Sequence, residues 1–100
     1  MVKTIALDEY LFATLMRDLA GHDRMPSAFL VYLYLTVESE KRKGQTVVAS
    51  HRTMAEMTGL SKSSVQKSIR WLAGRKLLKA AKASPTATPE YKVLQPWRRR

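Results

Sequence analysis

The sequence predicts a mainly α-helical domain of three to four helices, with one short strand and a small two-stranded β-hairpin. Three observations support this prediction. Apolar residues recur at helical spacing in several segments, two serines stand where helix N-caps are expected, and a proline-containing polar stretch near the C-terminus separates two half-apolar segments. A chain of 100 residues suits one domain with one modest core, so we expect a single domain over residues 1–100.

The first expected helix covers residues 8–20. Leu11, Leu15 and Leu19 recur at intervals of four and place one apolar stripe on this helix. Gly21 is expected to end it, because a residue just beyond a helix often adopts a positive φ that costs glycine little.

The second expected helix covers residues 27–42 and follows Pro26, whose missing N–H is no loss in a first helical turn. The segment is apolar on nearly all sides, so we expect a central helix. Its β-branched and aromatic content would also suit a strand, but its length and its polar continuation favour a helix. Tyr32 and Tyr34 are expected to be core or interface aromatics rather than reactive groups.

The most informative stretch is residues 50–74, which reads as two short helices joined by a tight turn. Ser50 and Ser61 are suited to cap the two helices, and Gly59 is suited to end the first. Leu60 is expected to fill the corner between them. Each helix has an expected inner side, formed in the first by Met54, Ala55 and Met57 and in the second by Val65, Ile69 and Leu72.

Short β-prone segments flank this two-helix unit. Residues 45–49 are expected to form a strand that leads into the cap at Ser50. Residues 77–95 hold two half-apolar segments around a stretch with two prolines, which predicts a β-hairpin with an exposed tip. Lys79 and Lys82 are expected to project from this hairpin.

The C-terminal end holds Trp97, followed by three arginines at residues 98–100. Trp97 is expected to anchor this end against the domain. Trp71 falls off the apolar stripe of its helix, so we expect it to pack under the hairpin or under the tail. The three arginines are expected either to add nonspecific affinity for an anionic partner or to carry no fixed structure.

Positive charge is confined to one half of the chain, whose formal net charge is +10. Residues 1–44 carry six Lys/Arg and six Asp/Glu, whereas residues 45–100 carry twelve Lys/Arg and only two acids, Glu56 and Glu90. A polyanion is the natural partner of such a segment, because binding to phosphates releases counterions. The alternative is a basic surface that serves solubility, but solubility does not require this segregation.

The helix after Ser61 carries polar side chains opposite its apolar stripe, and these have the donors and acceptors that base edges require. No acidic residue lies between Ser61 and Glu90 to repel phosphate. The alternative reading is an ordinary solvated helix face. The expected base contacts are Ser63, Gln66, Lys67 and Arg70. The expected phosphate contacts are Lys62, Ser64, Arg52 and the helix ends at Ser50 and Ser61.

The sequence carries no signature of an enzyme or of a metal site. Cysteine is absent, His22 and His51 lack a zinc-binding spacing, and no serine stands in a nucleophile-elbow setting. No cofactor and no small-molecule effector is therefore expected. The chain has no signal-peptide-like start and no apolar run long enough to span a bilayer, which predicts a cytoplasmic, nucleoid-associated protein without membrane contact.

The order of helix, short strand, two-helix unit and hairpin in residues 26–96 resembles a winged helix-turn-helix protein. The similar segment is VVASHRTMAEMTGLSKSSVQKSIRWLAGRKLL, which looks like the DNA-binding modules of MarR-type and GntR-type bacterial regulators and of some plasmid or phage replication proteins. The resemblance implies a helix-turn-helix unit at residues 50–74, a wing at residues 77–95, and sequence-specific binding of double-stranded DNA, often as a homodimer on an inverted repeat. It carries over as recognition-helix positions Lys62, Ser63, Ser64, Gln66, Lys67 and Arg70, and as wing positions Lys79 and Lys82.

The sequence departs from these modules in two ways. Lys76 stands where they often have glycine, just before the two leucines that start the wing. The chain also has little room for the ligand-sensing or dimerisation segment that many such regulators add. A dimer is therefore expected to use the first helix and the apolar second helix.

Four functions remain open. The first is a small bacterial, phage or plasmid transcriptional regulator, acting as a repressor that occupies a promoter. The second is a DNA-binding module of a replication or partition system, and the third is a winged-helix adaptor that binds another protein. The fourth is an RNA-binding protein, which the lack of an aromatic stacking platform in the basic half disfavours.

Overall fold

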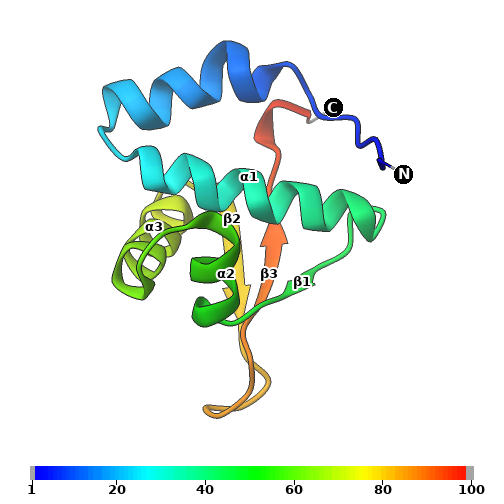
Figure 1. Ribbon diagram of the computed structural model, residues 1–100, viewed down its shortest axis with the longest axis vertical. Helices are drawn as coiled ribbons and strands as arrows, with labels where there is room; N and C mark the ends of the chain where they lie inside the picture. Colours follow the sequence, from blue (N-terminus) through cyan, green and yellow to red (C-terminus); the bar gives the residue numbers. More distant parts are fainter. Residues whose placement is uncertain (1, 99–100) are drawn as a thin grey trace.

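The computed structural model describes residues 2–98, which form a mainly helical domain with a small three-stranded antiparallel sheet (Figure 1). This outcome confirms the expected mainly α fold with a hairpin. The N-terminal helix consists of η1 (Leu11–Leu15) and η2 (Arg17–His22). The remaining elements are α1 (Pro26–Lys41), β1 (Val47–Val48), α2 (His51–Thr58), α3 (Lys62–Gly74), β2 (Leu78–Ala81), β3 (Glu90–Val93) and η3 (Pro96–Arg98).

The N-terminal helix is wound with i→i+5 hydrogen bonds, as in a π-helix, instead of the expected α-helical pattern. Its apolar stripe is buried as predicted, with Leu11, Leu15 and Leu19 in the core. The prediction that Gly21 ends the helix is wrong. The helix continues to His22, and the left-handed residue is Arg24, at φ 55°, where the following N–H returns to Leu19 O.

Helix α1 is the central element and lies between the N-terminal helix and the rest of the domain (Figure 1). It begins at Pro26, as expected, and ends at Lys41. Its buried side chains come from all along the helix and include Ala28, Phe29, Val31, Tyr32 and Leu35. The Tyr32 hydroxyl donates to the carbonyl of Leu94 at 2.8 Å, which ties α1 to the segment after the sheet. Tyr34 is half-buried.

The sheet has strand order β1-β3-β2, with both pairings antiparallel. Successive side chains of a strand alternate between the two faces of a sheet. The inner face places Val47 and Tyr91 in the core. The outer face is exposed, and on it Lys79 of β2 lies directly opposite Lys92 of β3.

The C-terminal segment η3 lies beside the start of the N-terminal helix (Figure 1). Trp97 stacks on Tyr10 with ring centroids 4.5 Å apart, and its indole N–H donates to Asp8 at 2.8 Å. These contacts fulfil the expectation that Trp97 anchors this end. Arg98 forms an ion pair with the same carboxylate, so it is engaged within the domain. The rest of the predicted arginine tail, residues 99–100, lies outside the described residues.

Among residues 2–98, no helix combines the length and the apolar character needed to cross a bilayer.

Candidate nucleic-acid interface

Helices α2 and α3 are joined by a tight turn whose hydrogen bonds follow the sequence prediction. The Ser50 hydroxyl accepts from the backbone N–H of Thr53 at 3.0 Å and so caps α2. Gly59 ends α2 in the left-handed conformation, at φ 80°. Met54 is buried and Leu60 packs on the core, but Met57 is 63% exposed, so its expected place on the inner side is wrong.

The position of α3 is fixed by its apolar side. Val65, Ile69 and Leu72 are buried, as predicted. Ser68 is buried beside them, and its hydroxyl donates to Ser27 Oγ of α1 at 3.0 Å. The Ser61 hydroxyl caps α3 by accepting from the N–H of Ser64 at 3.1 Å. These contacts hold α3 against α1 and leave its opposite side in solvent.

All four candidate base-contacting residues lie on the solvent side of α3. Ser63, Gln66, Lys67 and Arg70 are exposed, and no other part of the described chain covers them. Lys62, at the first position of the helix, is exposed as well. The outward face therefore offers hydroxyl, amide, ammonium and guanidinium groups along one helix.

The serine hydroxyls at the two helix starts are already used inside the protein. Ser50 Oγ bonds to Thr53, and Ser61 Oγ bonds to the hydroxyls of Ser63 and Ser64 at 3.2 and 3.0 Å. Ser64 is half-buried in this cluster. A phosphate would therefore meet these helix starts through backbone N–H groups more than through free hydroxyls.

Arg52 adds less net positive charge to the candidate interface than the sequence suggested, because it has an acidic partner. Its Nε lies 3.4 Å from a carboxylate oxygen of Glu56, one turn along α2. Both side chains are well exposed, so the pair adds little stability and exchanges readily with solvent ions. The exposed side of α2 is thus close to neutral.

The ion pairs divide the cations of the basic half into two groups. Arg52, Arg75 and Arg98 each have a carboxylate partner. Within the described residues, the others have no carboxylate within ion-pair distance; they are Lys62, Lys67, Arg70, Lys76, Lys79, Lys82 and Lys92. These seven residues, which we call the unpaired cations, belong to α3, to the turn that follows it and to the hairpin.

The hairpin carries three of the unpaired cations. Lys79 is exposed on β2, and Lys82 follows the strand with its Nζ 3.3 Å from the Pro85 carbonyl. Lys92 was not among the residues predicted from the sequence. Side chains alternate between the two faces of a strand, so buried Tyr91 places the neighbouring Lys92 on the exposed face. Only the strand register shows that Lys92 faces Lys79.

Lys76 has the left-handed backbone conformation that often ends a helix. Its φ is 59°, its N–H bonds to Ala73 O, and the N–H of Leu77 bonds to Leu72 O. This pair of hydrogen bonds is a Schellman motif, which ends a helix with one left-handed residue. The turn after α3 therefore has a lysine at a position that disfavours side chains.

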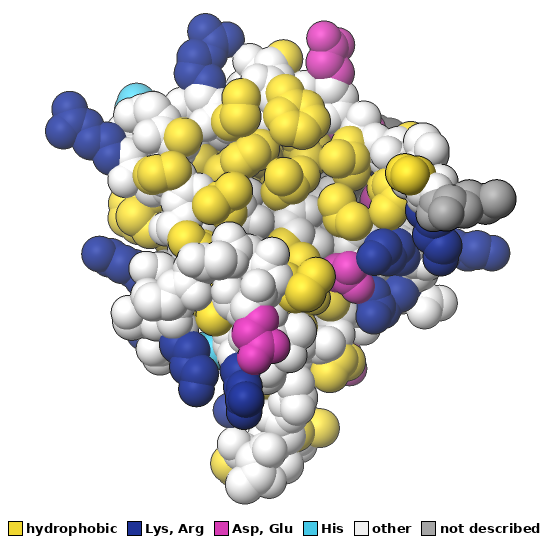
Figure 2. Space-filling model, viewed as in Figure 1, with side chains coloured by type: hydrophobic (Ala, Val, Ile, Leu, Met, Phe, Trp, Pro, Cys, Tyr) yellow, Lys and Arg dark blue, Asp and Glu magenta, His cyan; other side chains and the backbone are white. Residues whose placement is uncertain are grey.

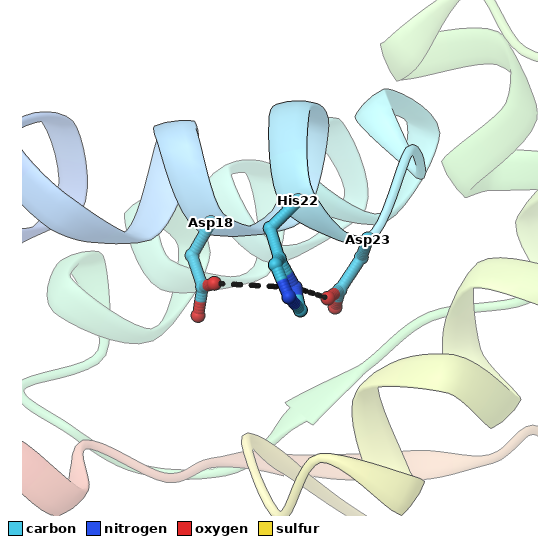
Figure 3. A group of neighbouring side chains, drawn as sticks. All are labelled: Asp18, His22 and Asp23. Atoms are coloured by element: carbon cyan, nitrogen blue, oxygen red, sulfur yellow. Dashed lines mark hydrogen bonds and ion pairs between the residues drawn. The ribbon is translucent and has the colours of Figure 1, made fainter.

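Asp18, His22 and Asp23 form a group at the end of the N-terminal helix, where the imidazole points between the two carboxylates (Figure 3). Their ligand atoms lie within 4.8 Å of one another, close enough for a metal site. Both carboxylates, however, hold the guanidinium of Arg75 at the end of α3, with 2.5 Å between Arg75 Nη2 and Asp18 Oδ2. The arrangement is an ion-pair network that connects the N-terminal helix to α3.

Asp23 also fixes the side chain of Trp71. The indole N–H donates to Asp23 Oδ2 at 2.8 Å. Burial raises the pKa of Asp23, but hydrogen bonds from Trp71 and His22 and the charge of Arg75 outweigh it and lower this pKa below its usual value. The expectation that Trp71 packs under the hairpin or the tail is wrong, because its partner is the link after the N-terminal helix.

Comparison with known proteins identified no related protein. A scan against protein-family models, a search of curated proteins and a search of solved structures each returned no match to this chain.

Proposed function

We propose that this protein is a winged helix-turn-helix protein that binds double-stranded DNA sequence-specifically and reads the major groove with α3. The observation that carries the proposal is the exposed outward face of α3, on which Lys67 and Arg70 have no carboxylate partner among the described residues. Lys62, exposed at the start of the helix, has none either. An α-helix fits the major groove, and the N-terminal residues of such a helix contact base edges first.

The exposed side chains of α3 have the chemistry that base edges require. Lys67 and Arg70 can donate to guanine O6 and N7, Gln66 can pair with adenine N6 and N7, and Ser63 can serve either base. The hairpin acts as the wing in this proposal, with Lys79 and Lys82 on the DNA backbone. Lys92 joins them, because it shares the outer face of the sheet with Lys79.

We propose a role as a small transcriptional regulator, a repressor that occupies its site in the cytoplasm, at the nucleoid. A DNA-binding module of a plasmid or phage replication or partition system would use the same contacts, and the bound sequence distinguishes the two. The proposal includes no enzymatic activity, cofactor or small-molecule effector. The absence of acidic residues from Lys62 to Pro89 supports a phosphate-bearing partner over an effector site.

A homodimer is part of the proposal. Figure 2 shows hydrophobic side chains gathered over the part of the molecule where Figure 1 places the N-terminal helix and α1. Phe12, Met16 and Leu30 are each more than 40% exposed. Leu30 also lines a shallow groove between α1 and α2, with Leu33, Tyr34, Val37 and Met57 as its apolar lining and Glu38, Lys41 and Thr58 as its polar lining. A second copy on this surface would present two α3 helices to an inverted repeat.

The same apolar surface supports the second candidate, an adaptor that binds another protein through α1. The two candidates differ in their response to salt, because an adaptor has no salt-dependent affinity for DNA.

The experiment that tests the proposal is selection of bound sequences from random duplexes at near-physiological salt. We expect enrichment of a palindromic sequence, which establishes specificity and dimer symmetry together. Recovery of an unenriched pool, with no salt-dependent binding to duplex DNA, would contradict the proposal and favour the adaptor.

A further inference from the structure

Gly74 has no structural need to be glycine. It lies in the last turn of α3 with φ in the ordinary helical range, and an added Cβ would meet nothing within 4 Å. The missing side chain relieves no contact within the described chain, and the space above Gly74 is open to an external group.

That space belongs to a shallow hollow lined by Arg70, Trp71, Gly74 and Arg75. The Trp71 indole is 40% exposed, and its N–H is already bonded to Asp23, so the exposed ring offers an apolar surface held in a fixed orientation. The charge of Arg75 is balanced by Asp18 and Asp23. Arg70, which also lines the hollow, has no carboxylate partner among residues 2–98.

The hollow continues the proposed DNA-binding face. Gly74 follows Ser63, Lys67 and Arg70 at helical spacing, so all four lie on one side of α3. Gly74 is seven residues beyond Lys67, or about 10 Å along the helix axis. The major groove is about 12 Å wide, so a helix whose N-terminal half contacts base edges carries its last turn towards the strand that borders the groove.

We propose that the hollow formed by Trp71, Gly74 and Arg70 binds the sugar–phosphate backbone of the DNA strand bordering the major groove. The apolar face of a deoxyribose packs on the Trp71 ring, the absence of a side chain at Gly74 allows the backbone to approach, and Arg70 pairs with the adjacent phosphate. The DNA backbone thus offers an apolar deoxyribose next to a phosphate, which matches the apolar Trp71 ring next to the unpaired charge of Arg70. The inference rests on the proposed function and changes it in one respect: Arg70 contacts the backbone, and Ser63, Gln66 and Lys67 read the bases.

The test compares Gly74→Leu with Gly21→Leu. Gly21 is the matched control, because it is also a helical glycine with no atom within 4 Å of an added Cβ, but it lies on the N-terminal helix. The probe is a mixed-sequence duplex of about 24 base pairs, roughly two helical turns, in a fluorescence-anisotropy titration at low salt. We expect Gly74→Leu to weaken binding about tenfold with an unchanged or higher unfolding midpoint, and Gly21→Leu to leave the affinity unchanged.

Arg70→Ala supplies a second readout on duplexes recovered by selection. Loss of a backbone contact lowers the affinity for all sequences by the same factor, whereas loss of a base contact relaxes the preference at one position. Equal affinities of the wild type and Gly74→Leu, or a relaxed base preference in Arg70→Ala, would overturn the inference. The proposed function still holds after either result if Lys67→Ala weakens binding. A wild type that fails to bind any duplex refutes the proposed function itself.

Discussion

Lys79 and Lys92 lie directly opposite each other on the exposed face of the hairpin. Like charges in directly opposed positions of an antiparallel pair destabilise it. Neither lysine has a carboxylate partner among the described residues, and Glu90, on the same face, pairs across with Ala81. The free protein therefore keeps an unfavourable pair that an anionic partner would relieve.

Replacing Lys92 with threonine removes this repulsion and adds a residue that favours strands. We expect Lys92→Thr to raise the free energy of unfolding by about 0.5 kcal/mol, measured by urea denaturation. We also expect weaker binding to duplex DNA at every sequence, with the slope of log affinity against log salt reduced by about 1. Lys3→Thr, the same change in the neutral half of the chain, should leave that slope unchanged. An unchanged slope in Lys92→Thr would place Lys92 outside the interface.

Lys76 ends α3 in a conformation that disfavours side chains. Lys76→Gly removes this strain, and we expect it to raise the free energy of unfolding by about 1 kcal/mol, measured by denaturant unfolding monitored by circular dichroism. The turn and its two hydrogen bonds should persist, because glycine is the usual residue there. A variant less stable than the wild type would mean that the Lys76 side chain stabilises the fold more than its backbone strain costs.

The two-helix unit could be predicted from the sequence because its signals are local. Ser50, Gly59 and Ser61 act within a few residues of their own positions, and the stripe from Val65 to Leu72 follows from helical periodicity alone. Because that stripe is buried, it also predicted that the opposite face of α3 is exposed. Caps and periodicity are short-range properties, and here they agree with the tertiary structure.

The contacts that connect distant parts of the chain could not be predicted in this way. Asp8 meets Trp97 across 89 positions, and Asp23 meets Arg75 across 52. Such partners depend on how the elements pack, which spacing does not encode. The i→i+5 winding of the N-terminal helix was missed for a related reason, because leucines four apart form a stripe in either kind of helix.

Asp8 connects the two ends of the described chain, and its protonation should loosen them. Hydrogen bonds from Arg98 and Trp97 lower the pKa of Asp8 from 3.8 to about 2. Because the folded state favours the ionised form, the resulting stability is present above pH about 4 and is lost as the pH falls towards about 2. We expect Asp8→Asn to be less stable than the wild type at pH 7, with the difference shrinking over this acid range in urea denaturation. A difference that stays constant with pH would contradict this assignment.

Asp23 should matter more than an exposed carboxylate, because it is nearly buried and accepts from both Trp71 and Arg75. We expect Asp23→Asn to lower the free energy of unfolding by about 1–3 kcal/mol, measured by urea denaturation. Glu56→Gln is the matched control, since it makes the same acid-to-amide change in an exposed pair, with an expected cost of under about 0.5 kcal/mol. Equal effects of the two substitutions would mean that the Asp23 network does not hold α3.

The most direct test of DNA binding by α3 is the affinity of Lys67→Ala/Arg70→Ala for the duplex recovered by selection, measured beside the wild type. Lys3→Ala/Lys43→Ala is the matched control, because it also removes two exposed positive charges that have no carboxylate partner among the described residues, but in the neutral half of the chain. We predict a loss of at least about 30-fold in the α3 variant and little change in the control. An α3 variant that binds the duplex as tightly as the wild type would contradict the account.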